Sequence, residues 1–445
     1  MAQSFLSAFM TSKLVAEFRQ LNEKEGSNPP KQVPEPAPIG GVDVRCGPIL
    51  RLCGTHESSN LPNYRATLLL VIKDDKGAEE KIPTVSYEIS GLGSKGEFDG
   101  VVFHKTKGYS FIRYAISFLL QEHEQLIEYS INGERKNGFH FYVPAVNQLM
   151  NVVLFSCNGF SLGVDPSDFK SSPWFDVLKN HQEKHYHVML GGGDQIYSDS
   201  IKKHSKKLQG WMEETSKHKK RTMEIDQEAL DEFHDYYLNN YLGWFGQGFW
   251  EGPNGTTLQG CFPAAMASIP SVNIYDDHDI IDGFGSYKDK TMQLPYFSAI
   301  GNVAYEYYML FQHQMSVDEA VHNDAKAEPQ WIIPNQKGPF IKQKNHSNYV
   351  RLGKEIALVG VDCRTERRLS EIVTKPSYDA IFARLEREIT AAPEIKHLLV
   401  MLGVPIMYPR LAWLEWLLTS SLLKPARALA VKGVINKGLV NEFDG

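Results

Sequence analysis

The sequence predicts an α/β fold in which a small antiparallel β-sandwich domain precedes a larger α/β domain. Between residues 42 and 146, short β-rich runs alternate with turn signals, which is typical of an antiparallel sheet. From residue 147 onward, apolar runs end in polar or glycine residues and are followed by helical patterns, which is typical of parallel strands joined by helices. The length of 445 residues also exceeds what one ordinary core fills. We therefore expect an N-terminal arm and proline-rich linker over 1–41, an antiparallel β domain over 42–146 and an α/β domain over 147–445.

The N-terminal arm starts with residues 1 to about 25, which can form a short helix. The stretch that follows, N-P-P-K-Q-V-P-E-P-A-P-I-G-G, contains five prolines and two glycines. Proline lacks the backbone N–H that helices and central strands need. This stretch is therefore predicted to be a linker or a wrapping arm.

Six β-rich runs follow, and turn sequences such as Asn132-Gly133 and Asn137-Gly138 favour hairpins between them. Phe111–Leu120 is ambiguous because its apolar spacing also fits one face of a helix, and we favour a strand for its first half. We expect this region to have its own core and to supply no metal ligand, because it contains no cluster of acids or histidines. The six runs are Ile49–Cys53, Ala66–Lys73, Thr84–Ile89, Val101–His104, Gln125–Ile131 and Phe139–Val143.

Five apolar runs in the α/β region are predicted strands, and polar or glycine residues follow each of them. In open α/β sheets the functional groups gather at the carboxyl ends of the strands. We therefore expect the side chains of Cys157, Asp194 and Asp277 to lie within the span of one metal cluster. The five runs are Asn151–Phe155, Val188–Leu190, Ser271–Tyr275, Ile356–Val361 and His397–Leu402.

Two further stretches favour helices. Asp199–Asp235 mixes both charge signs and is predicted to be a solvated helical face, although its lysines can also steer an anion. Leu411–Leu423 is 13 residues long and contains Glu415, whereas a helix that spans a bilayer needs roughly 20 apolar residues. It predicts a buried amphipathic helix, and we expect no membrane span.

The stretch His187–Asp199, H-V-M-L-G-G-G-D-Q-I-Y-S-D, predicts a buried strand that delivers Asp194 to the edge of a sheet. The three glycines before Asp194 allow a sharp turn and leave space beside the carboxylate. Tyr197 follows at a spacing that can aim both oxygens at one point. The alternative is a strand-end aspartate that caps a helix above a packed tyrosine.

Asp276-Asp277-His278-Asp279 is the densest cluster of hard ligands in the chain, and Asp282 extends it. Three carboxylates and an imidazole in four residues repel one another unless cations or hydrogen bonds compensate. The cluster therefore favours a metal site, with a solvated acidic loop as the alternative.

Cys157 also follows an apolar run. A thiolate beside a carboxylate and a phenolate suits a highly charged transition metal such as ferric iron, whereas carboxylates alone suit calcium or magnesium. The alternative for Cys157 is a small buried hydrophobic side chain.

Composition narrows the classes of partner and compartment. The net charge of -6 gives no reason to expect a nucleic-acid partner. The five cysteines are few, odd in number and scattered, which fits free thiols in a reducing compartment. The N-terminus lacks a charged region followed by a long apolar run, so we expect no signal peptide. We expect a cytoplasmic protein, and the sequence identifies no partner protein.

Four motifs in this order and spacing resemble the PhoD-like phosphatase family, particularly its fungal branch. They are S-C-N at 156–158, G-G-G-D-Q-I-Y at 191–197, N-I-Y-D-D-H-D-I-I-D-G-F-G-S-Y at 273–287 and V-D-C-R-T-E-R at 361–367. The likeness covers residues from about 147 to the end, and the preceding β region matches the N-terminal module of such proteins. It implies a layered α/β/β/α metallophosphatase-like domain and a metal-dependent phosphoesterase with ferric and calcium ions at the sheet edge.

Carried over by position, the resemblance implies that Cys157, Asp194 and Tyr197 are iron ligands and that Asp194 bridges to calcium. It implies calcium binding through Asp277 and Asp282, although the family often has asparagine near the latter position. One expected motif is missing, because no Gly-Asp-x-His follows residue 403. Against the resemblance, either the sequence is truncated at its C-terminus or its lineage has lost this segment, and in both cases at least one expected metal ligand is missing.

The first functional hypothesis is a phosphoric-ester hydrolase in which metal ions hold the phosphoryl oxygens and a metal-bound hydroxide attacks phosphorus in line. It assigns catalytic roles to Asp194, His278 and Arg364, with His278 and its neighbours also supporting the ligands from the second sphere. It assigns substrate binding to Asn158 and Arg364. The phosphate-ester substrate is the one partner that this hypothesis names.

The planar guanidinium of Arg364 can bind a phosphate oxygen, or it can form an ion pair with Asp362 or Glu366. The second functional hypothesis is a non-catalytic relative that binds a phosphorylated ligand or a protein. Its best surface is the aromatic run Tyr241–Trp250, for which core packing is the alternative role.

Overall fold

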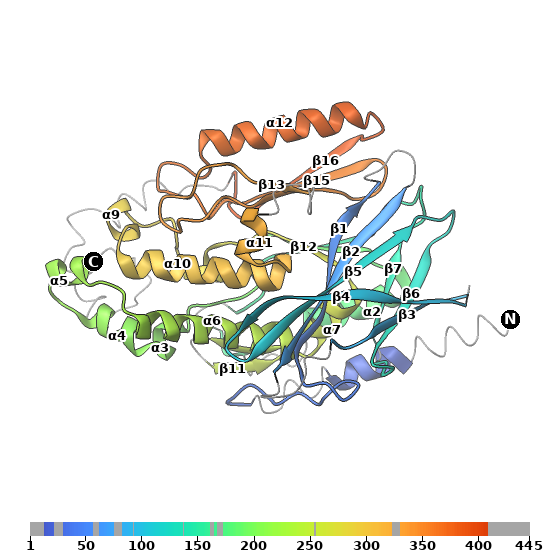
Figure 1. The fold of residues 1–445 in the computed structure, drawn as a ribbon, viewed down its shortest axis with the longest axis horizontal. Helices are drawn as coiled ribbons and strands as arrows, with labels where there is room; N and C mark the ends of the chain where they lie inside the picture. The colour runs from blue at the N-terminus through green and yellow to red at the C-terminus, as the bar shows by residue number, and fades with distance from the viewer. Residues whose placement is uncertain are drawn as a thin grey trace.

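The fold is α/β, as the sequence predicts, and its described residues form one large curled sheet, one small four-stranded sheet and a two-stranded hairpin (Figure 1). Residues 13–21 of the N-terminal arm form a helix, whereas Leu411–Leu423 lies outside the described part of the chain. None of the described helices is long and apolar enough to cross a bilayer. The computed structural model describes residues 13–21, 30–56, 62–74, 82–91, 93–136, 138–160, 164–166, 172–252, 255–322 and 330–407.

Ten strands form the large sheet, which is antiparallel through its N-terminal strands and parallel where β1, β12, β9 and β8 adjoin. It contains all six predicted runs of the β region and the first three of the α/β region. Its strands in spatial order are β7 (His140–Val143), β6 (Gln125–Ile131), β3 (Val85–Ile89), β4 (Ser94–Thr106), β5 (Tyr109–Leu119), β2 (Asn63–Lys73), β1 (Val44–Thr55), β12 (Ser271–Asn273), β9 (Val188–Gly191) and β8 (Val152–Phe155).

Two local predictions in the β region can be compared with the structure. β5 is a strand over its whole length because it pairs with β2 on one side and β4 on the other, so the helical alternative is wrong. Asn132 and Gly133 both have positive φ, 46° and 81°, as a two-residue hairpin turn of this kind requires. The side chains of β5 that alternate into the core are Ile112, Tyr114, Ile116 and Phe118.

The large sheet curls because β4 changes its partner along its length. Its first half pairs with β3 and its second half with β5. The outer strands thereby fold over the face of β2 and β5, where the rings of Tyr64 and Phe141 lie 6.2 Å apart and those of Tyr87 and Phe118 lie 5.2 Å apart. The sandwich expected in this region is therefore made by one sheet that folds back on itself.

The β region shares its core with the rest of the chain, which corrects the expectation of an independent core. β1 pairs in parallel with β12 through Arg51 and Ser271, so the sheet runs across the expected boundary at residue 146. β2 is buried on both faces, with Leu68 in one hydrophobic cluster and Leu69 in the other. The division into domains stays a prediction.

The small sheet lies between the large sheet and a helix, and its strand order is β13 (Trp331–Ile332), β14 (Ser347–Arg351), β15 (Ile356–Val361) and β16 (His397–Leu402). The strands expected over Ile356–Val361 and His397–Leu402 are confirmed. Alternation along β15 explains the layers, because Val359 packs under α12 (Lys375–Ala391) and Leu358 packs toward the large sheet. Met189 of β9 faces the helices on the far side. The order helix, sheet, sheet, helix agrees with the layering implied by the resemblance (Figure 1).

Helices α6, α7 and α10 cover the outer face of the large sheet, and the segment predicted as a helical excursion forms α3 to α6. The aromatic run Tyr241–Trp250 belongs to the core, where Trp244 and Phe245 are each 1% exposed. The predicted binding surface for the second hypothesis is therefore wrong. A hairpin is formed by β10 (Phe249–Gly252) and β11 (Gly255–Leu258). Besides α12 and the helix over residues 13–21, the described part of the chain contains α2 (Pro173–Lys184), α3 (Ile201–His204), α4 (Lys206–Glu213), α5 (Lys217–Thr222), α6 (Gln227–Gln247), α7 (Cys261–Ser268), α8 (Asp277–Ile280), α9 (Asp289–Met292), α10 (Pro295–Tyr308), the π-helix η2 (Met309–His313) and α11 (Val317–His322).

Candidate metal centre

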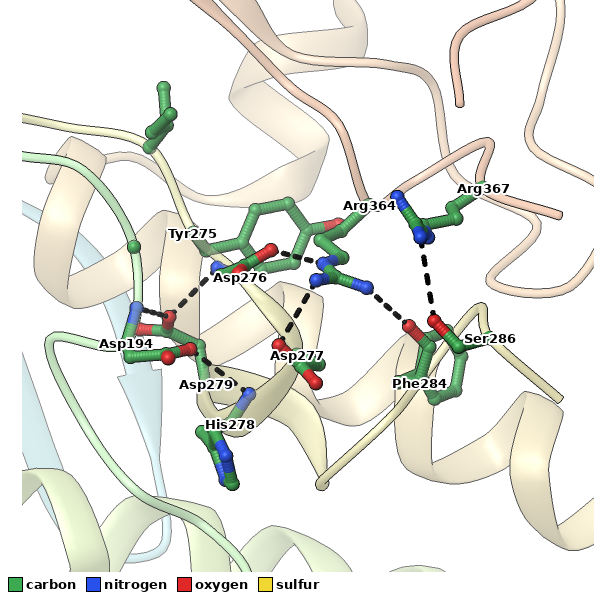
Figure 2. A network of polar contacts seen from close by, with 12 residues as sticks. Asp194, Tyr275, Asp276, Asp277, His278, Asp279, Phe284, Ser286, Arg364 and Arg367 are labelled. Carbon is green, nitrogen blue, oxygen red and sulfur yellow. Dashed lines mark hydrogen bonds and ion pairs between the residues drawn. The ribbon is translucent and has the colours of Figure 1, made fainter. Parts of the chain in front are cut away.

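The carboxyl ends of β8, β9 and β12 meet at one point, together with the end of β15 from the small sheet (Figure 2). Carboxylate oxygens of Asp194, Asp276 and Asp277 can all lie within 4.8 Å of one another. The Cys157 Sγ is 3.5 Å from Asp194 Oδ2. The side chains of Cys157, Asp194 and Asp277 therefore gather on one side of the sheet edge, as the strand pattern predicts.

The glycines before Asp194 allow the turn after β9 to approach the turn after β12. Gly193 has φ 115°, and a Cβ added to it would lie 2.6 Å from the Cβ of Asp276. No other residue fits both that conformation and that contact. Asp194 has φ 55°, which is a conformation that aspartate and asparagine tolerate better than most residues. The close approach of the two turns thus depends on Gly193.

Cys157 is held against Asp194 by its own backbone. Its N–H donates to the carbonyl of Gly193 over 3.1 Å, and the N–H of Asn158 donates to the carbonyl of Asp194 over 2.8 Å. Cys157 also has a positive φ of 53° and is solvent-exposed. The alternative of a small buried hydrophobic side chain is therefore wrong for Cys157.

A thiol, a phenol and a carboxyl adjoin at this end of the site, and the anionic form of each is disfavoured. Partial desolvation of the sulfur and the charge of Asp194 raise the pKa of the Cys157 thiol. Burial and the charges of Asp194 and Cys157 raise the pKa of Tyr197, and burial also raises the pKa of Asp194. A cation among them would offset both the burial and the repulsion. The donor set of Cys157, Asp194 and Tyr197 therefore fits a highly charged metal ion.

Arg364 neutralises the two acids that open α8. Its Nε donates to Asp276 Oδ1, its Nη2 donates to Asp277 Oδ1 over 3.0 Å and its Nη1 donates to the carbonyl of Phe284 over 2.8 Å. Burial raises the pKa of Asp276 to about 7, and the hydrogen bond and charge of Arg364 oppose that rise. The alternative of an ion pair between Arg364 and Asp362 or Glu366 is wrong, because Arg364 pairs with Asp276 and Asp277. Asp362 instead accepts the backbone N–H groups of Arg364 and Thr365.

His278 lies between Asp199 and the acid cluster. Its Nδ1 is 2.6 Å from Asp199 Oδ2, its Nε2 is 3.8 Å from Asp282 Oδ1, and its ring stacks on Tyr197 with centroids 4.5 Å apart. Burial acts to lower the pKa of His278, but the hydrogen bond and charge of Asp199 raise it to about 9. Asp277, His278 and Asp282 form a second group whose ligand atoms can converge within 4.8 Å.

Asp279 hydrogen-bonds the backbone of the two turns that carry the candidate ligands Asp194 and Asp276. It is 1% exposed, and its Oδ2 accepts the N–H of Asp194 over 2.7 Å and the N–H of Asp276 over 2.9 Å. Its Oδ1 accepts from Gln312 over 3.0 Å. Sequence reasoning gave neither this role nor that of Asp199. For Asp279 the available signal was its position three residues after a helix-capping aspartate.

Both polar atoms of the Asn158 amide have hydrogen-bond partners within the protein. Its Nδ2 is 3.4 Å from the carbonyl of Gln195, and its Oδ1 accepts from the indole of Trp174 over 2.9 Å. The predicted role of Asn158 in substrate binding stays a prediction. Both groups of clustered acids come from residues 194–282, and among the described residues the β region contributes to neither.

Comparison with known proteins places this geometry in context. The profile of the family described as PhoD related phosphatase matches residues 129–436. Uncharacterized protein YGR266W of Saccharomyces cerevisiae is 43% identical over 434 residues, which cover 92% of this chain and 60% of that protein. The chain thus spans about 60% of the length of this relative.

Proposed function

Because the chain belongs to the family of PhoD-related phosphatases, we propose that it hydrolyses phosphoric esters with the help of bound metal ions. The observation that carries the proposal is the convergence of Asp194, Asp276 and Asp277 at the ends of parallel strands, within 4.8 Å of one another. Three acids this close repel one another unless cations or hydrogen bonds compensate, and bound cations also attract the phosphoryl oxygens of an ester.

We propose ferric iron for Cys157, Asp194 and Tyr197, because thiol, phenol and carboxyl adjoin there and each has a raised pKa. We propose calcium for Asp277 and Asp282, because carboxylate oxygens are the donors it prefers. A bound metal ion supplies positive charge to the phosphoryl oxygens and lowers the pKa of a water ligand.

The protein's own side chains have three tasks in this proposal. Arg364 holds Asp276 and Asp277 in place through a planar guanidinium that is 6% exposed. Asp199 fixes Nδ1 of His278 and favours its protonated form, which leaves the Nε2 proton for the oxygen of the departing alcohol. Asp194 links Cys157 to the acidic motif at 276–279, because its Oδ2 contacts the Cys157 thiol and its Oδ1 accepts the backbone N–H of His278.

The test is metal content and phosphate release on the same preparation. We expect bound iron, and we expect release of p-nitrophenol from its phosphate mono- or diester that stops when the metal is removed. The matched variants are Asp194→Asn and Asp379→Asn, because Asp379 is exposed on α12 and pairs with Lys375. Loss in Asp194→Asn alone supports the proposal. A metal-loaded chain that hydrolyses neither ester contradicts it.

Cytoplasmic location also remains a proposal. The five cysteines form no disulfide with one another, which supports a reducing compartment. A fluorescent fusion found in the secretory pathway would contradict it. The non-catalytic alternative has lost its predicted surface and gains no other support.

A further inference from the structure

Every nitrogen of the Arg364 guanidinium already donates to a protein oxygen, which leaves one further N–H on each of Nη1 and Nη2. All three of its nitrogens are bonded, two to carboxylates and one to a backbone carbonyl, and the side chain is buried. To bind the planar fork of Arg364 bidentately through its two carboxylate-bonded N–H groups, a phosphoryl group would have to displace Asp276 or Asp277. Breaking a buried ion pair of this kind is costly because it leaves a charge uncompensated. A cation without carboxylate partners is therefore the stronger candidate for binding an anion at this site.

Arg367 is the next cation in the same turn. Its N–H donates to the carbonyl of Arg364 over 3.3 Å, and the two guanidinium groups lie on the same side of the loop that contains Phe284 and Ser286 (Figure 2). Its stem packs over Gly285, where an added Cβ would lie 2.7 Å from Arg367 Cγ. Gly285 has φ 87° as well, so both its conformation and its lack of a side chain position Arg367.

The guanidinium of Arg367 is poorly satisfied. Its Nη2 has one long contact of 3.5 Å to Ser286 Oγ, whereas Nε and Nη1 are buried without a hydrogen-bond partner. Among the described residues no carboxylate lies within 4.0 Å of it, although Asp276 and Asp277 are close enough to act on its charge. Unpartnered charged donors are costly, and an oxyanion satisfies them with strong hydrogen bonds.

We propose that Arg367, rather than Arg364, binds the tetrahedral oxyanion at this site, with its planar fork directed at two oxygens of the phosphoryl group. This inference rests on the proposed function for the identity of the anion. Arg364 then remains the fixed counter-charge of Asp276 and Asp277, and Arg367 determines the affinity for the phosphoryl group. The two arginines of one turn thus have separate tasks.

The experiment measures the binding of inorganic phosphate by calorimetry and the KM for a phosphate ester, with metal content as a parallel readout. In Arg367→Met we expect phosphate affinity to fall and KM to rise by about ten- to a hundred-fold, with kcat and bound metal changed much less. Arg367→Lys should recover only part of the affinity, because lysine lacks the fork. The matched control is Arg387→Met, since Arg387 is exposed on α12 and pairs with Glu388.

If Arg367→Met does not fold, Gly285→Ala gives the same test, because the added Cβ displaces the stem of Arg367. Unchanged phosphate affinity in the Arg367 variants overturns the inference, as does a wild-type protein that binds no phosphate. Loss of affinity in Arg364→Met alone would assign the role to Arg364. A wild type that binds phosphate through Arg367 but hydrolyses no ester would contradict the proposed function and leave this inference standing.

Discussion

Replacing Asp279 with alanine should destabilise the fold strongly, although Asp279 stands in the same acidic motif as the candidate ligands. Its carboxylate accepts three hydrogen bonds, from the N–H groups of Asp194 and Asp276 and from the amide of Gln312, over 2.7, 2.9 and 3.0 Å. These bonds join the turn after β9 to the turn after β12. Alanine would leave three buried donors without an acceptor.

The expected cost follows from those three donors. A buried donor that loses its partner costs about 1–3 kcal/mol, and water that enters the vacated space recovers part of that cost. We therefore expect the free energy of unfolding to fall by about 3–5 kcal/mol, which is in the range that single substitutions rarely reach. Asp279→Asn should cost less, because its amide oxygen can still accept from Asp194 and Asp276.

The assay is denaturant unfolding of the metal-free protein, followed by tryptophan fluorescence. The control is Asp282→Ala, because the Asp282 side chain is 56% exposed and its nearest charged contact, His278 Nε2, is 3.8 Å away. The control should stay within about 0.5 kcal/mol of wild type. An unchanged midpoint for Asp279→Ala would refute the reasoning, since the three donors would then have found other acceptors.

The other predictions concern the neighbouring turns and the buried histidines. Asp194→Asn should change the free energy of unfolding by less than about 1 kcal/mol, because asparagine tolerates φ 55° and can still accept the N–H of His278. The same variant should lose bound metal, and phosphate release should therefore fall at least about 100-fold. A variant with normal metal content and retained turnover would exclude Asp194 as a ligand. Gly193→Ala should cost more than about 2 kcal/mol, because φ is 115° and the new methyl would lie 2.6 Å from Asp276 Cβ; an unshifted thermal midpoint contradicts this. Burial lowers the pKa of His346 to about 3, below its value of about 6.5 in the unfolded chain. The stability that depends on the neutral ring is therefore complete above pH 6.5 and falls as the pH drops toward 3. At pH 5 the free energy of unfolding should be lower by about 2 kcal/mol. His346→Phe should remove that part of the acid sensitivity while His218→Phe, on exposed α5, keeps it; equal pH slopes in the two variants would disprove the account.

The strands that deliver the site were predictable because each carries a local signal. Each of β8, β9 and β12 is a short uninterrupted run in the sequence, and the glycines before Asp194 directly follow the apolar residues of β9. The carboxyl ends of neighbouring parallel strands lie at the same edge of a sheet, so the meeting of these ends could be predicted. β14 was missed because its residues, S-N-Y-V-R, lack an apolar pattern although all five are buried. Their polar groups find partners far away in the chain, as when Asn348 donates to the carbonyl of Asn273 over 3.3 Å. Such long-range pairing produces no local pattern in the sequence from which a strand could be predicted.

The curl of the large sheet was not predictable for a related reason. β4 looks like one ordinary strand in the sequence, but its two halves pair with different neighbours. The choice depends on cores that lie on both sides of β2 and that include residues from β9, β12 and the helices. The sequence showed β strands with turns between them, and a separate domain is the simplest arrangement of that pattern. Only the parallel pairing of β1 with β12 reveals the continuous sheet.

The motif at 276–279 shows why the separate roles of adjacent acidic and histidine residues cannot be predicted from the sequence. Four adjacent residues there point in different directions because a short helix begins at Asp277. Asp276 and Asp277 reach Arg364, His278 reaches Asp199 on the opposite side, and Asp279 turns back into the core. Arg364 and His278 supply positive charge on either side of the acids, which lets the acids remain close before any metal binds. A metal ion that enters the site must therefore compete with Arg364 for Asp276 and Asp277. Removing the Arg364 charge should consequently tighten metal binding to these two acids even as it weakens the metal-free fold.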